Sequence, residues 1–547
     1  MALFRAINCK YKPALTTLFN FKIYKSTNQT EIKMKFNLIF RSSVSACFEF
    51  DNNTAFYNDT PYRICVNGLW SDVEKRENVF SLFSLAPDTE YTVSTSLSNH
   101  TVTFKTLTET CAYTVKSFGA TGDGVTNDTV NVQNAIDMCP DGGRVVFEKG
   151  VYLLGPIKIK SNVTVDIQKG AVLLGSTNEA DYPIVPGEFN DLAEKPLHFA
   201  SWEGTPTACH QPFVGIYSAK NVKIVGEGII DGNAQNAKWW INHRARKIGR
   251  PRLFFTHFAK DIYLHGVTGK NSASWSFHPY FSENVNFFDT RVIAPADSPN
   301  TDGLDPESCN GVTIIGMVFS VGDDAIAIKS GKYYMGMKYN TPAINHTIRN
   351  CKMEFAHGGV VLGSEMSGGV KNLTVEKCLF VGTDRGLRIK TRRGRGKNAV
   401  IDGLLFKNIK MDGVKAPFTI NMFYFCDPDG KTPYVWSKEP LEVDERTPYI
   451  GSFVFEDIEC LNSCWCAGYF YGLPERHVKS VTFRNVSVTY NKDAEQGLPL
   501  MMTDAESCKN AGFIFRNVDS VTIDNVKLDG VNGQEFVFEN VKEKVGF

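Results

Sequence analysis

The 547-residue sequence lacks an excess of charge of either sign. It has 59 Lys and Arg residues against 59 Asp and Glu residues, which gives a formal net charge of zero. A balanced chain has no overall field that attracts nucleic acid or an anionic membrane, so we expect neither as a partner. Any charged ligand must then be bound by a local group of side chains.

Long hydrophobic runs are also missing. No stretch is long and apolar enough to cross a bilayer as a helix. Residues 1–34 are basic and contain no continuous apolar segment, so they do not resemble a secretory signal, and we interpret them as an extension outside the fold. We expect a cytoplasmic protein, with a secreted or periplasmic location as the alternative.

The 14 cysteines are scattered instead of forming a dense framework, which excludes a small disulfide-stapled domain. We expect most of them to be free and buried. Cys460, Cys464 and Cys466 lie close together, but no His or fourth Cys follows at a spacing typical of zinc sites. We predict strand packing there, and we expect neither a metal nor another cofactor.

Glycine and phenylalanine are abundant, with 45 and 39 residues, which favours a mostly β protein. Residues 35–108 contain short alternating runs such as SVSACFEF and HTVTFKT between turn residues. This pattern predicts a small β-sandwich. Within it, LAPDTEYTV (residues 85–93) resembles a late strand of fibronectin type III modules.

Within residues 111–547, one pattern recurs beyond residue 220: a small residue precedes alternating apolar residues. Copies include NVKIVG at 221, NVNFFD at 284, GVTIIG at 311, NLTVEK at 372 and SVTFRN at 480. A fixed strand core at irregular spacing is typical of a right-handed parallel β-helix, in which coils stack while the turns vary in length. The sequence therefore predicts an all-β fold: this solenoid, preceded by the sandwich.

A short helix is predicted over residues 129–138, ahead of the coils. Asp128 stands at the position of a helix cap, and Val132 and Ile136 share an apolar face. Such a helix would cover the first coil, whose open edge would otherwise pair with another chain.

Three carboxylates have a spacing that suits one face of the solenoid. Asp323 follows Asp302 by 21 residues, about one coil, so both should lie on the same face in adjacent coils. Neighbouring strand residues point to opposite sides, so Asp324 joins them only if the backbone bends. We expect Gly322 to supply this bend, because glycine adopts conformations that other residues avoid.

The following coils should add one imidazole and two cations. His357 occupies the same repeat position as Asp323 one coil later, and Arg388 and Lys390 follow on the next coil. Glycoside hydrolysis needs one protonated and one ionised carboxyl group, and crowded carboxylates acquire different pKa values. The two cations would suit a uronic acid, because they could bind its carboxylate.

Each of these features also has an ordinary structural interpretation. An Asp-Asp pair is usually a solvated turn, His357 could be a buried core histidine, and RRGRGK could be an exposed loop. Trp239, Trp240 and Trp275 are interpreted first as core residues and only second as sugar platforms. The shared phase on successive coils favours the functional interpretation.

Four ordered motifs resemble the polygalacturonases of glycoside hydrolase family 28. They are SPNTDG around Asp302, GDD with Asp323 and Asp324, HGGVVLGS from His357, and RIK at 388–390. The resemblance implies an inverting hydrolase of α-1,4-linked galacturonan. It implies Asp323 as general acid, Asp302 and Asp324 as the groups that activate water, and His357 as the residue that tunes the acid.

The resemblance also implies substrate-binding roles for Arg388, Lys390, Asn300 and, by a looser match, Tyr424. The substrate would be a pectic polysaccharide or an oligogalacturonide, and we expect a monomer. The sandwich and the insertions at 183–212 and 427–450 are similar to those of the bacterial exo-acting branch, so we expect exo action. Exo action needs a cleft that is closed at one end, and these segments could form the closing wall. Endo action, rhamnogalacturonan or xylogalacturonan as substrate, a pectate lyase and a non-catalytic carbohydrate-binding solenoid are the alternatives.

Overall fold

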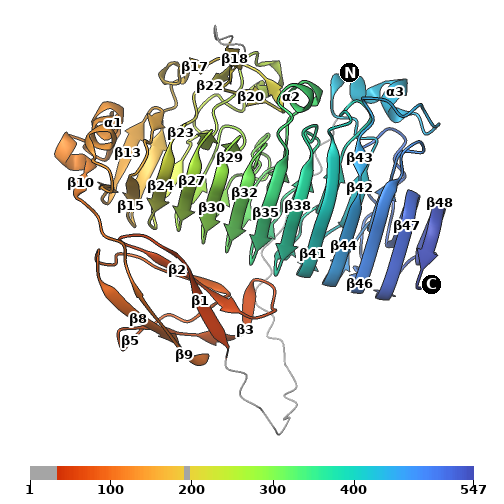
Figure 1. The fold of residues 1–547 in the computed structure, drawn as a ribbon, viewed down its shortest axis with the longest axis horizontal. Coiled ribbons are helices and arrows are strands. Elements are labelled where there is room, and N and C mark those ends of the chain that lie inside the picture. Colours follow the sequence, from red (N-terminus) through yellow and green to blue (C-terminus); the bar gives the residue numbers. More distant parts are fainter. Residues whose placement is uncertain (1–33, 190–196) are drawn as a thin grey trace.

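The computed structural model describes residues 34–189 and 197–547. These form an antiparallel sandwich followed by a long right-handed parallel β-helix, which confirms the predicted fold class (Figure 1). The predicted extension, residues 1–34, lies outside the described residues except for Met34. No helix in the described ranges is both long and apolar enough to cross a membrane.

The sandwich consists of two antiparallel sheets with strand orders β1-β2-β7 and β5-β4-β8-β9, together with a β3-β6 ribbon. Both sheets contribute to one hydrophobic core, in which Phe48 stacks on Phe80 with ring centroids 5.0 Å apart. The strands are β1 (Lys35–Arg41), β2 (Ala46–Asp51), β3 (Tyr57–Tyr62), β4 (Ile64–Val66), β5 (Leu69–Trp70), β6 (Lys75–Glu77), β7 (Val79–Leu82), β8 (Glu90–Thr95) and β9 (Ser98–Lys105).

The solenoid has three stacks of parallel strands, which we call faces A, B and C. Face A contains β10 (Ala112–Thr114), β12 (Arg144–Phe147), β15 (Thr164–Ile167), β24 (Lys220–Val225), β27 (Lys260–His265), β30 (Glu283–Phe288), β32 (Asn310–Ile315), β35 (Ala343–Arg349), β38 (Val370–Glu376), β41 (Val400–Asp412), β44 (Ser452–Ser463) and β46 (Val478–Tyr490), with β43 (Tyr449–Ile450) beside β41. The long strands β41, β44 and β46 continue into face B.

Face B begins with β11 and ends where these long strands take over. It contains β11 (Asp123–Asn127), β13 (Gly150–Leu154), β16 (Ala171–Gly175), β25 (Ile229–Asp231), β28 (Thr268–Lys270), β31 (Arg291–Ile293), β33 (Val318–Ser320), β36 (Lys352–Glu354) and β39 (Leu379–Val381).

Face C carries the predicted site residues. It contains β14 (Ile157–Lys158), β23 (Val214–Tyr217), β26 (Phe254–His257), β29 (Phe277–Tyr280), β34 (Ile326–Ile328), β37 (Gly358–Leu362), β40 (Arg385–Lys390), β42 (Ala416–Asn421) and β45 (Cys466–Tyr471), and it continues into β47 (Ala511–Asp529) and β48 (Phe536–Val545). Between β29 and β34 the stack passes through Leu304, which bridges Phe277 and Ile326.

In four of the five quoted repeats, the first residue has a backbone explanation. Asn221, Asn284, Gly311 and Asn372 have φ values of 53°, 50°, 73° and 55°, in the left-handed region. Glycine and asparagine tolerate this region better than other residues. The pattern therefore marks the corner at which the chain enters face A.

The predicted helix forms as α1 (Thr129–Met138), and it packs Val132 and Ile136 against the first coils at one end of the solenoid (Figure 1). The prediction that Asp128 caps this helix is wrong, because its side chain makes no capping hydrogen bond. Its carboxylate instead accepts hydrogen bonds from the backbone N–H groups of Thr121 (2.8 Å) and Gly122 (2.9 Å). Asp128 therefore holds the preceding turn.

Insertions gather on the edge of the solenoid opposite the sandwich (Figure 1). They comprise the short strands β17 (Ile184–Val185), β18 (Glu188–Phe189), β19 (Leu197–His198), β20 (Ser201–Trp202), β21 (Thr205–Pro206) and β22 (Cys209–His210), and the helices α2 (Tyr333–Lys338) and α3 (Pro433–Trp436). The two segments singled out from the sequence, 183–212 and 427–450, both belong to this group.

The sandwich is fixed to the solenoid by a dense interface. Glu49 accepts two hydrogen bonds from Arg349 (2.7 and 2.8 Å), and the ring of His265 is hydrogen-bonded to both Ser45 and Ser81. Among the described residues, none of the hydrogen bonds and ring contacts that cross this interface involves a predicted site residue. The sandwich therefore supports the solenoid from the side away from the insertions.

The thirteen cysteines within the described residues are free thiols, and most are buried, as predicted. Cys460 and Cys466 are buried strand residues in face B and face C, and Cys464 is half-buried between them.

Candidate active site

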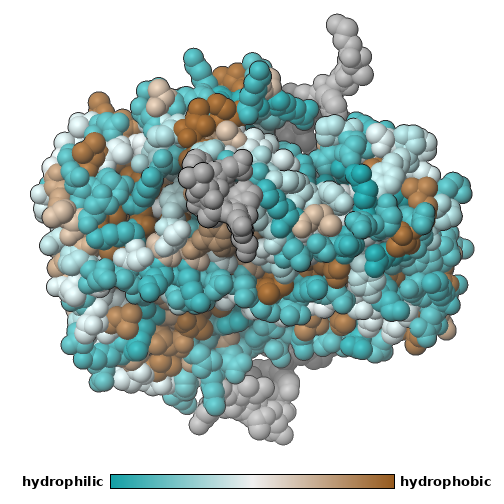
Figure 2. Space-filling view, turned by 45° about the horizontal axis from the view of Figure 1, so that its top comes forward, coloured by the Kyte–Doolittle hydropathy of each residue, from teal (hydrophilic) through white to brown (hydrophobic). Residues whose placement is uncertain are grey.

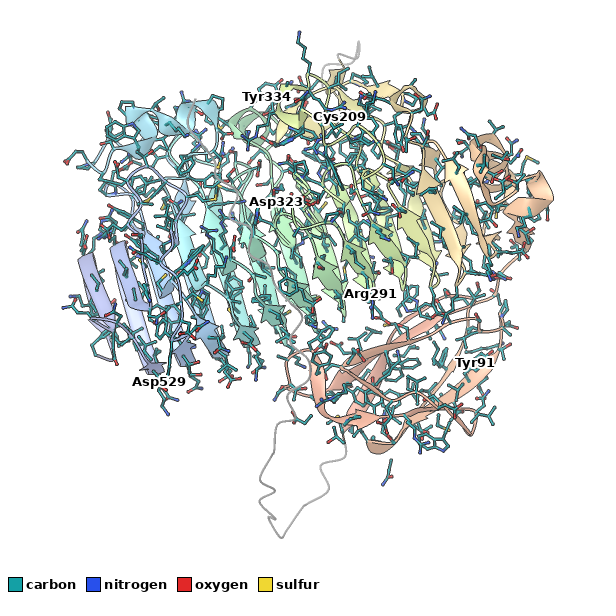
Figure 3. The ribbon with its side chains drawn as sticks, turned by 180° about the vertical axis from the view of Figure 1, so that it is seen from behind. Tyr91, Cys209, Arg291, Asp323, Tyr334 and Asp529 are labelled. Carbon is teal, nitrogen blue, oxygen red and sulfur yellow. The ribbon has the colours of Figure 1, made fainter. Side chains whose placement is uncertain are left out.

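The three predicted carboxylates meet at the corner that leads into face C. Oxygen atoms of Asp302, Asp323 and Asp324 lie within 4.8 Å of one another. The stacking of coils sets this geometry, because Asp324 O accepts a hydrogen bond from Gly303 N (2.9 Å) in the preceding coil. In the view of Figure 3, Asp323 lies near the middle of the solenoid and away from Tyr91 in the sandwich.

The backbone bends at Gly322 as predicted, but the reason for the glycine differs from the expectation. Its φ lies outside the left-handed region, and a Cβ atom there would lie 2.5 Å from Ser298 O and 2.6 Å from Pro295 O. Gly322 is therefore needed because two carbonyl groups approach it closely, and not because of an unusual backbone conformation.

The environments of the buried carboxylates push their pKa values in opposite directions. Burial, together with Asp305 and Asp323, raises the pKa of Asp302 well above its ordinary value. Burial also acts to raise the pKa of Asp324, but Lys390 and Arg388 outweigh it and hold that pKa well below the usual range. Separate pKa values in one crowded site are what acid–base chemistry requires.

Asp323 and His357 form the accessible part of the site. The side chain of Asp323 is 28% exposed and that of His357 is 54% exposed, and His357 Nδ1 lies 3.4 Å from Asp323 Oδ1. The backbone N–H of His357 donates to Asp323 O (3.0 Å), so the two residues are in adjacent coils as predicted. The hydrogen bond with Asp323 raises the pKa of His357.

Arg388 and Lys390 point to the same side of β40, as predicted, and both contact Asp324. Lys390 Nζ donates to Asp324 Oδ2 (2.7 Å), and Arg388 Nη1 donates to Oδ1 (3.3 Å). Tyr424 is close by, with Lys390 Nζ 5.5 Å from its ring centroid. The two cations therefore balance a buried carboxylate, besides any role in binding substrate.

Asn300 is engaged by an arginine that sequence analysis did not single out. Its Oδ1 accepts a hydrogen bond from Arg250 Nη2 (2.6 Å), and Arg250 also donates to Pro299 O (3.0 Å). The guanidinium carbon of Arg250 lies 5.2 Å from the ring centroid of Trp202, in the 183–212 insertion. Asn300 is thereby connected to that insertion.

A second, fully buried layer of charges lies behind the carboxylates, and sequence analysis missed it. Lys329 Nζ lies 3.7 Å from Asp302 Oδ2, 3.4 Å from Asp305 Oδ1 and 3.4 Å from Glu365 Oε2. One signal was available, because IAIK places a lysine directly after an apolar strand that is buried on both sides. A buried lysine needs partners of opposite charge, so a lysine at this position predicts buried carboxylates nearby.

The tryptophans divide between core and site. Trp239 and Trp275 are buried and Trp240 is half-buried, in agreement with the core interpretation. Trp275 also contacts the charged layer, with Lys329 Nζ 4.3 Å and the guanidinium of Arg252 4.4 Å from its ring centroid.

Three carboxylates this close together could bind a divalent cation, but cationic side chains already contact two of them. Both oxygens of Asp324 accept hydrogen bonds from cations, and Asp302 faces Lys329. A site built for Ca²⁺ would instead offer free carboxylate oxygens. The residues present therefore fit acid–base chemistry better than cation binding.

The sequence profile described as "Glycosyl hydrolases family 28" matches residues 145–436, more than half of the chain. The chain belongs to glycosyl hydrolase family 28. The matched range contains all eight predicted site residues. A second profile, "Rhamnogalacturonase A/epimerase, pectate lyase-like", matches residues 112–176, at the start of the solenoid.

Curated relatives in family 28 include both modes of action. A "Probable polygalacturonase" from Vitis vinifera is 31% identical over 306 residues, 54% of this chain and 60% of that protein. An "Exo-poly-alpha-D-galacturonosidase" from Dickeya chrysanthemi is 28% identical and covers 65% of this chain and 64% of that protein. An "Endo-polygalacturonase" from Pectobacterium carotovorum is 29% identical and covers 54% and 72%.

Two solved structures described as exopolygalacturonases share the fold. An exopolygalacturonase from Yersinia enterocolitica matches with a TM-score of 0.68 at 18% identity, and covers 94% of this chain and 98% of that one. One from Thermotoga maritima matches with a TM-score of 0.62 at 24% identity, covering 78% and 93%. The chain spans about 60% of the length of the first curated relatives that it matches.

Proposed function

We propose that this protein is a polygalacturonase-type glycoside hydrolase that cleaves α-1,4-galacturonosidic bonds by single displacement. The observation that carries the proposal is the meeting of Asp302, Asp323 and Asp324 in one site, where Asp323 is the accessible carboxyl group and Lys390 and Arg388 hold the buried Asp324 ionised. Family membership and the curated polygalacturonases that the chain resembles support the same reaction.

In this proposal, Asp323 is the general acid. It is the most accessible of the three carboxyl groups, so it can reach the glycosidic oxygen of a bound chain. Protonation of that oxygen allows the leaving sugar to depart as an alcohol. His357 lies beside Asp323, so the pair can hold one proton on either partner, and bulk water can restore the proton after each turnover.

Asp302 and Asp324 are the groups that activate water. Asp324 remains ionised, because Lys390 and Arg388 stabilise its charge. Asp302 has a raised pKa, so it is a stronger base once it is ionised. A water molecule between them would be oriented by both and would lose its proton as it attacks the anomeric carbon.

Lys390, Arg388 and Tyr424 form the side of the site that suits a uronate ring. A carboxylate approaching Lys390 can share its ammonium with Asp324, since an ammonium has three N–H donors and the structure uses one of them on Asp324. Hydrophilic residues cover most of the face seen in Figure 2, which suits a hydrated, charged polysaccharide.

A single measurement tests the reaction type. With oligogalacturonide in EDTA, we expect a saturated product whose new reducing end first appears in proton NMR as the β-anomer, because direct attack by water inverts an α-linkage. The oxygen spacing of at most 4.8 Å is shorter than the roughly 6.5–9.5 Å usual between the carboxyl groups of inverting enzymes, so the anomer is an informative readout. An initial α-anomer would contradict single displacement, and a product that absorbs in the ultraviolet would indicate a lyase.

We further propose exo action, because Lys332 links the two insertions close to the site. Lys332 N donates to Gly204 O (2.8 Å) in the first insertion, and Lys332 Nζ lies 2.8 Å from Asp427 Oδ1 in the second. Asp427 is also bound by Arg392 (3.0 Å) and Arg395 (2.7 Å). A wall held by this many ion pairs would stop a polymer from passing through on that side.

Digestion of a defined oligogalacturonide tests exo action. We expect one short product of constant length from the first minutes, and a slow fall in the viscosity of polygalacturonate, because a closed cleft admits only a chain end. Ion-exchange chromatography of time points provides the measurement. A mixture of intermediate lengths at early times would instead favour endo action, and release only from rhamnogalacturonan or xylogalacturonan would change the substrate.

The sandwich, which we interpret as a fibronectin type III-like module, would act in this proposal as a support. Its contacts to the solenoid involve Arg349 and His265, on face A, and not the corner that carries the three aspartates. We therefore assign the wall to the insertions alone, whereas the sequence had suggested that the module also contributes to it.

A further inference from the structure

Lys329 follows the face C strand β34 directly and lies beneath the three aspartates. Its side chain is 3% exposed, and its ammonium group contacts three carboxylates. Asp302 and Asp305 belong to the preceding coil, and Glu365 belongs to the following coil. Its Nζ also lies over the ring of Trp275 (4.3 Å to the centroid). A substrate bound in the cleft cannot touch it.

We propose that Lys329 is a positioning residue that holds Asp302 in place and keeps it ionised for the attack of water, and that Asp305 opposes it. This inference rests on the proposed hydrolase function. Among the described residues, Lys329 is the one cation within 4 Å of Asp302, whereas Asp324 has two such cations of its own. The charge of Asp302 therefore depends on a single ammonium group.

That ammonium is shared, which makes Asp302 sensitive to its neighbours. Asp305 is fully buried, and neither of its carboxylate oxygens has a hydrogen-bond partner, so its charge is offset mainly by Lys329 at 3.4 Å and, from farther away, by Arg252. Glu365 uses the same ammonium from the other side. One ammonium cannot fully balance three carboxylates, and burial raises the pKa of Asp305 to about 7.

Charged neighbours act on the pKa of Asp302 in both directions. Asp305, Asp323 and Asp324 act to raise its pKa, and Lys329 acts to lower it. Arg250 and Arg252 are more distant cations whose own pKa values respond to Asp302. Removal of Lys329 should therefore make Asp302 harder to ionise, whereas removal of the charge on Asp305 should make it easier.

These opposite signs distinguish positioning from a purely structural role. A lysine that only filled space or stabilised the coil would, when replaced, lower stability without moving the pH dependence of catalysis. The acidic limb of kcat/KM reports the ionisation of the base in the free enzyme. This limb should move to higher pH in Lys329→Met and to lower pH in Asp305→Asn.

The experiment measures kcat and KM on an oligogalacturonide across pH for the wild type, Lys329→Met and Asp305→Asn, with Lys407→Met as a matched control. Lys407 pairs with Glu456 on face A and does not contact the site. We expect the acidic limb to rise by about one pH unit in Lys329→Met, because an opposite charge within about 4 Å lowers a carboxyl pKa by about that much or more. At pH values below the acidic limb, this shift lowers kcat roughly tenfold relative to the wild type, and KM changes by less than about twofold.

Two results would overturn the inference: unchanged limbs in both variants, or limbs that move in the same direction. If Lys329→Met does not fold, Asp305→Asn still tests the downward shift, and Lys329→Met with Glu365→Gln removes one charge of each sign and should still raise the limb. Failure of the proposed function is a separate result, because the wild type itself would then release no sugar.

Discussion

Replacement of Asp323 by Asn should lower kcat on oligogalacturonide by about a thousandfold, while the dissociation constant for the same ligand changes little. A positioned general acid contributes typically about 10²–10⁴-fold, and an amide of the same shape cannot deliver a proton to the leaving oxygen. Asp323 is the exposed carboxyl group of the three and the partner of His357, so no other group is placed to replace it. Initial rates of reducing-sugar release, with calorimetry for binding, measure both quantities.

The matched control for this variant is Asp524→Asn. Asp524 is an exposed aspartate in β47, near the far end of the solenoid, and its replacement should leave the rate unchanged. Retention of more than a tenth of the wild-type rate in Asp323→Asn would remove Asp323 from the role of acid. Binding without any sugar release in the wild type would instead support the alternative of a carbohydrate-binding solenoid.

The sequence predicted that the three aspartates lie together, because coil stacking converts sequence spacing into position. Asp302 and Asp323 are 21 residues apart, and the hydrogen bonds between adjacent coils bring them together. The same logic placed His357 beside Asp323. In a parallel stack, the register of one strand fixes its neighbour, so a repeat pattern carries three-dimensional information.

The features that the sequence did not reveal are contacts between buried charged side chains and contacts between the sandwich and the solenoid. Lys329 directly follows β34 and lies in the same register as Lys390 after β40, but the repeat pattern does not show that the carboxylates of Asp305 and Glu365 meet its ammonium group. Glu49 binds Arg349 across 300 residues, and no local pattern specifies that pair. The mistaken cap at Asp128 has a similar cause, because a nearby turn offered its carboxylate two backbone donors.

The contact of the two cations with Asp324 was not predicted from the sequence. Arg388 and Lys390 were expected to bind the substrate carboxylate, and the structure shows that both contact Asp324. Their side chains are almost fully buried, so any contact with substrate occurs at the edge of an ion pair that already exists. In the proposed reaction, catalysis and substrate binding would thus be coupled through the carboxylate of Asp324.

Replacement of Lys390 by Met should therefore lower kcat/KM by about two orders of magnitude, with effects on both kcat and KM. Removing one partner of a buried, hydrogen-bonded charge pair costs about 2–5 kcal/mol, and here the pair is Lys390 with Asp324 at 2.7 Å. Loss of Lys390 lets the pKa of Asp324 rise, so the fraction of ionised base falls first at low pH. Steady-state kinetics at several pH values measure the change, with Lys407→Met as the control.

The substrate side of the same variant can be separated from its effect on Asp324. If Lys390 also binds the uronate carboxylate, the wild type should prefer free galacturonate over its methyl ester at the site of cleavage, and Lys390→Met should reduce that preference. If Lys390→Met lowers kcat/KM equally on the free acid and the methyl ester, the preference for galacturonate is unchanged. Lys390 would then act only by holding Asp324. Carboxylate recognition would then fall to Arg388, whose guanidinium offers the remaining N–H donors on this side of the site.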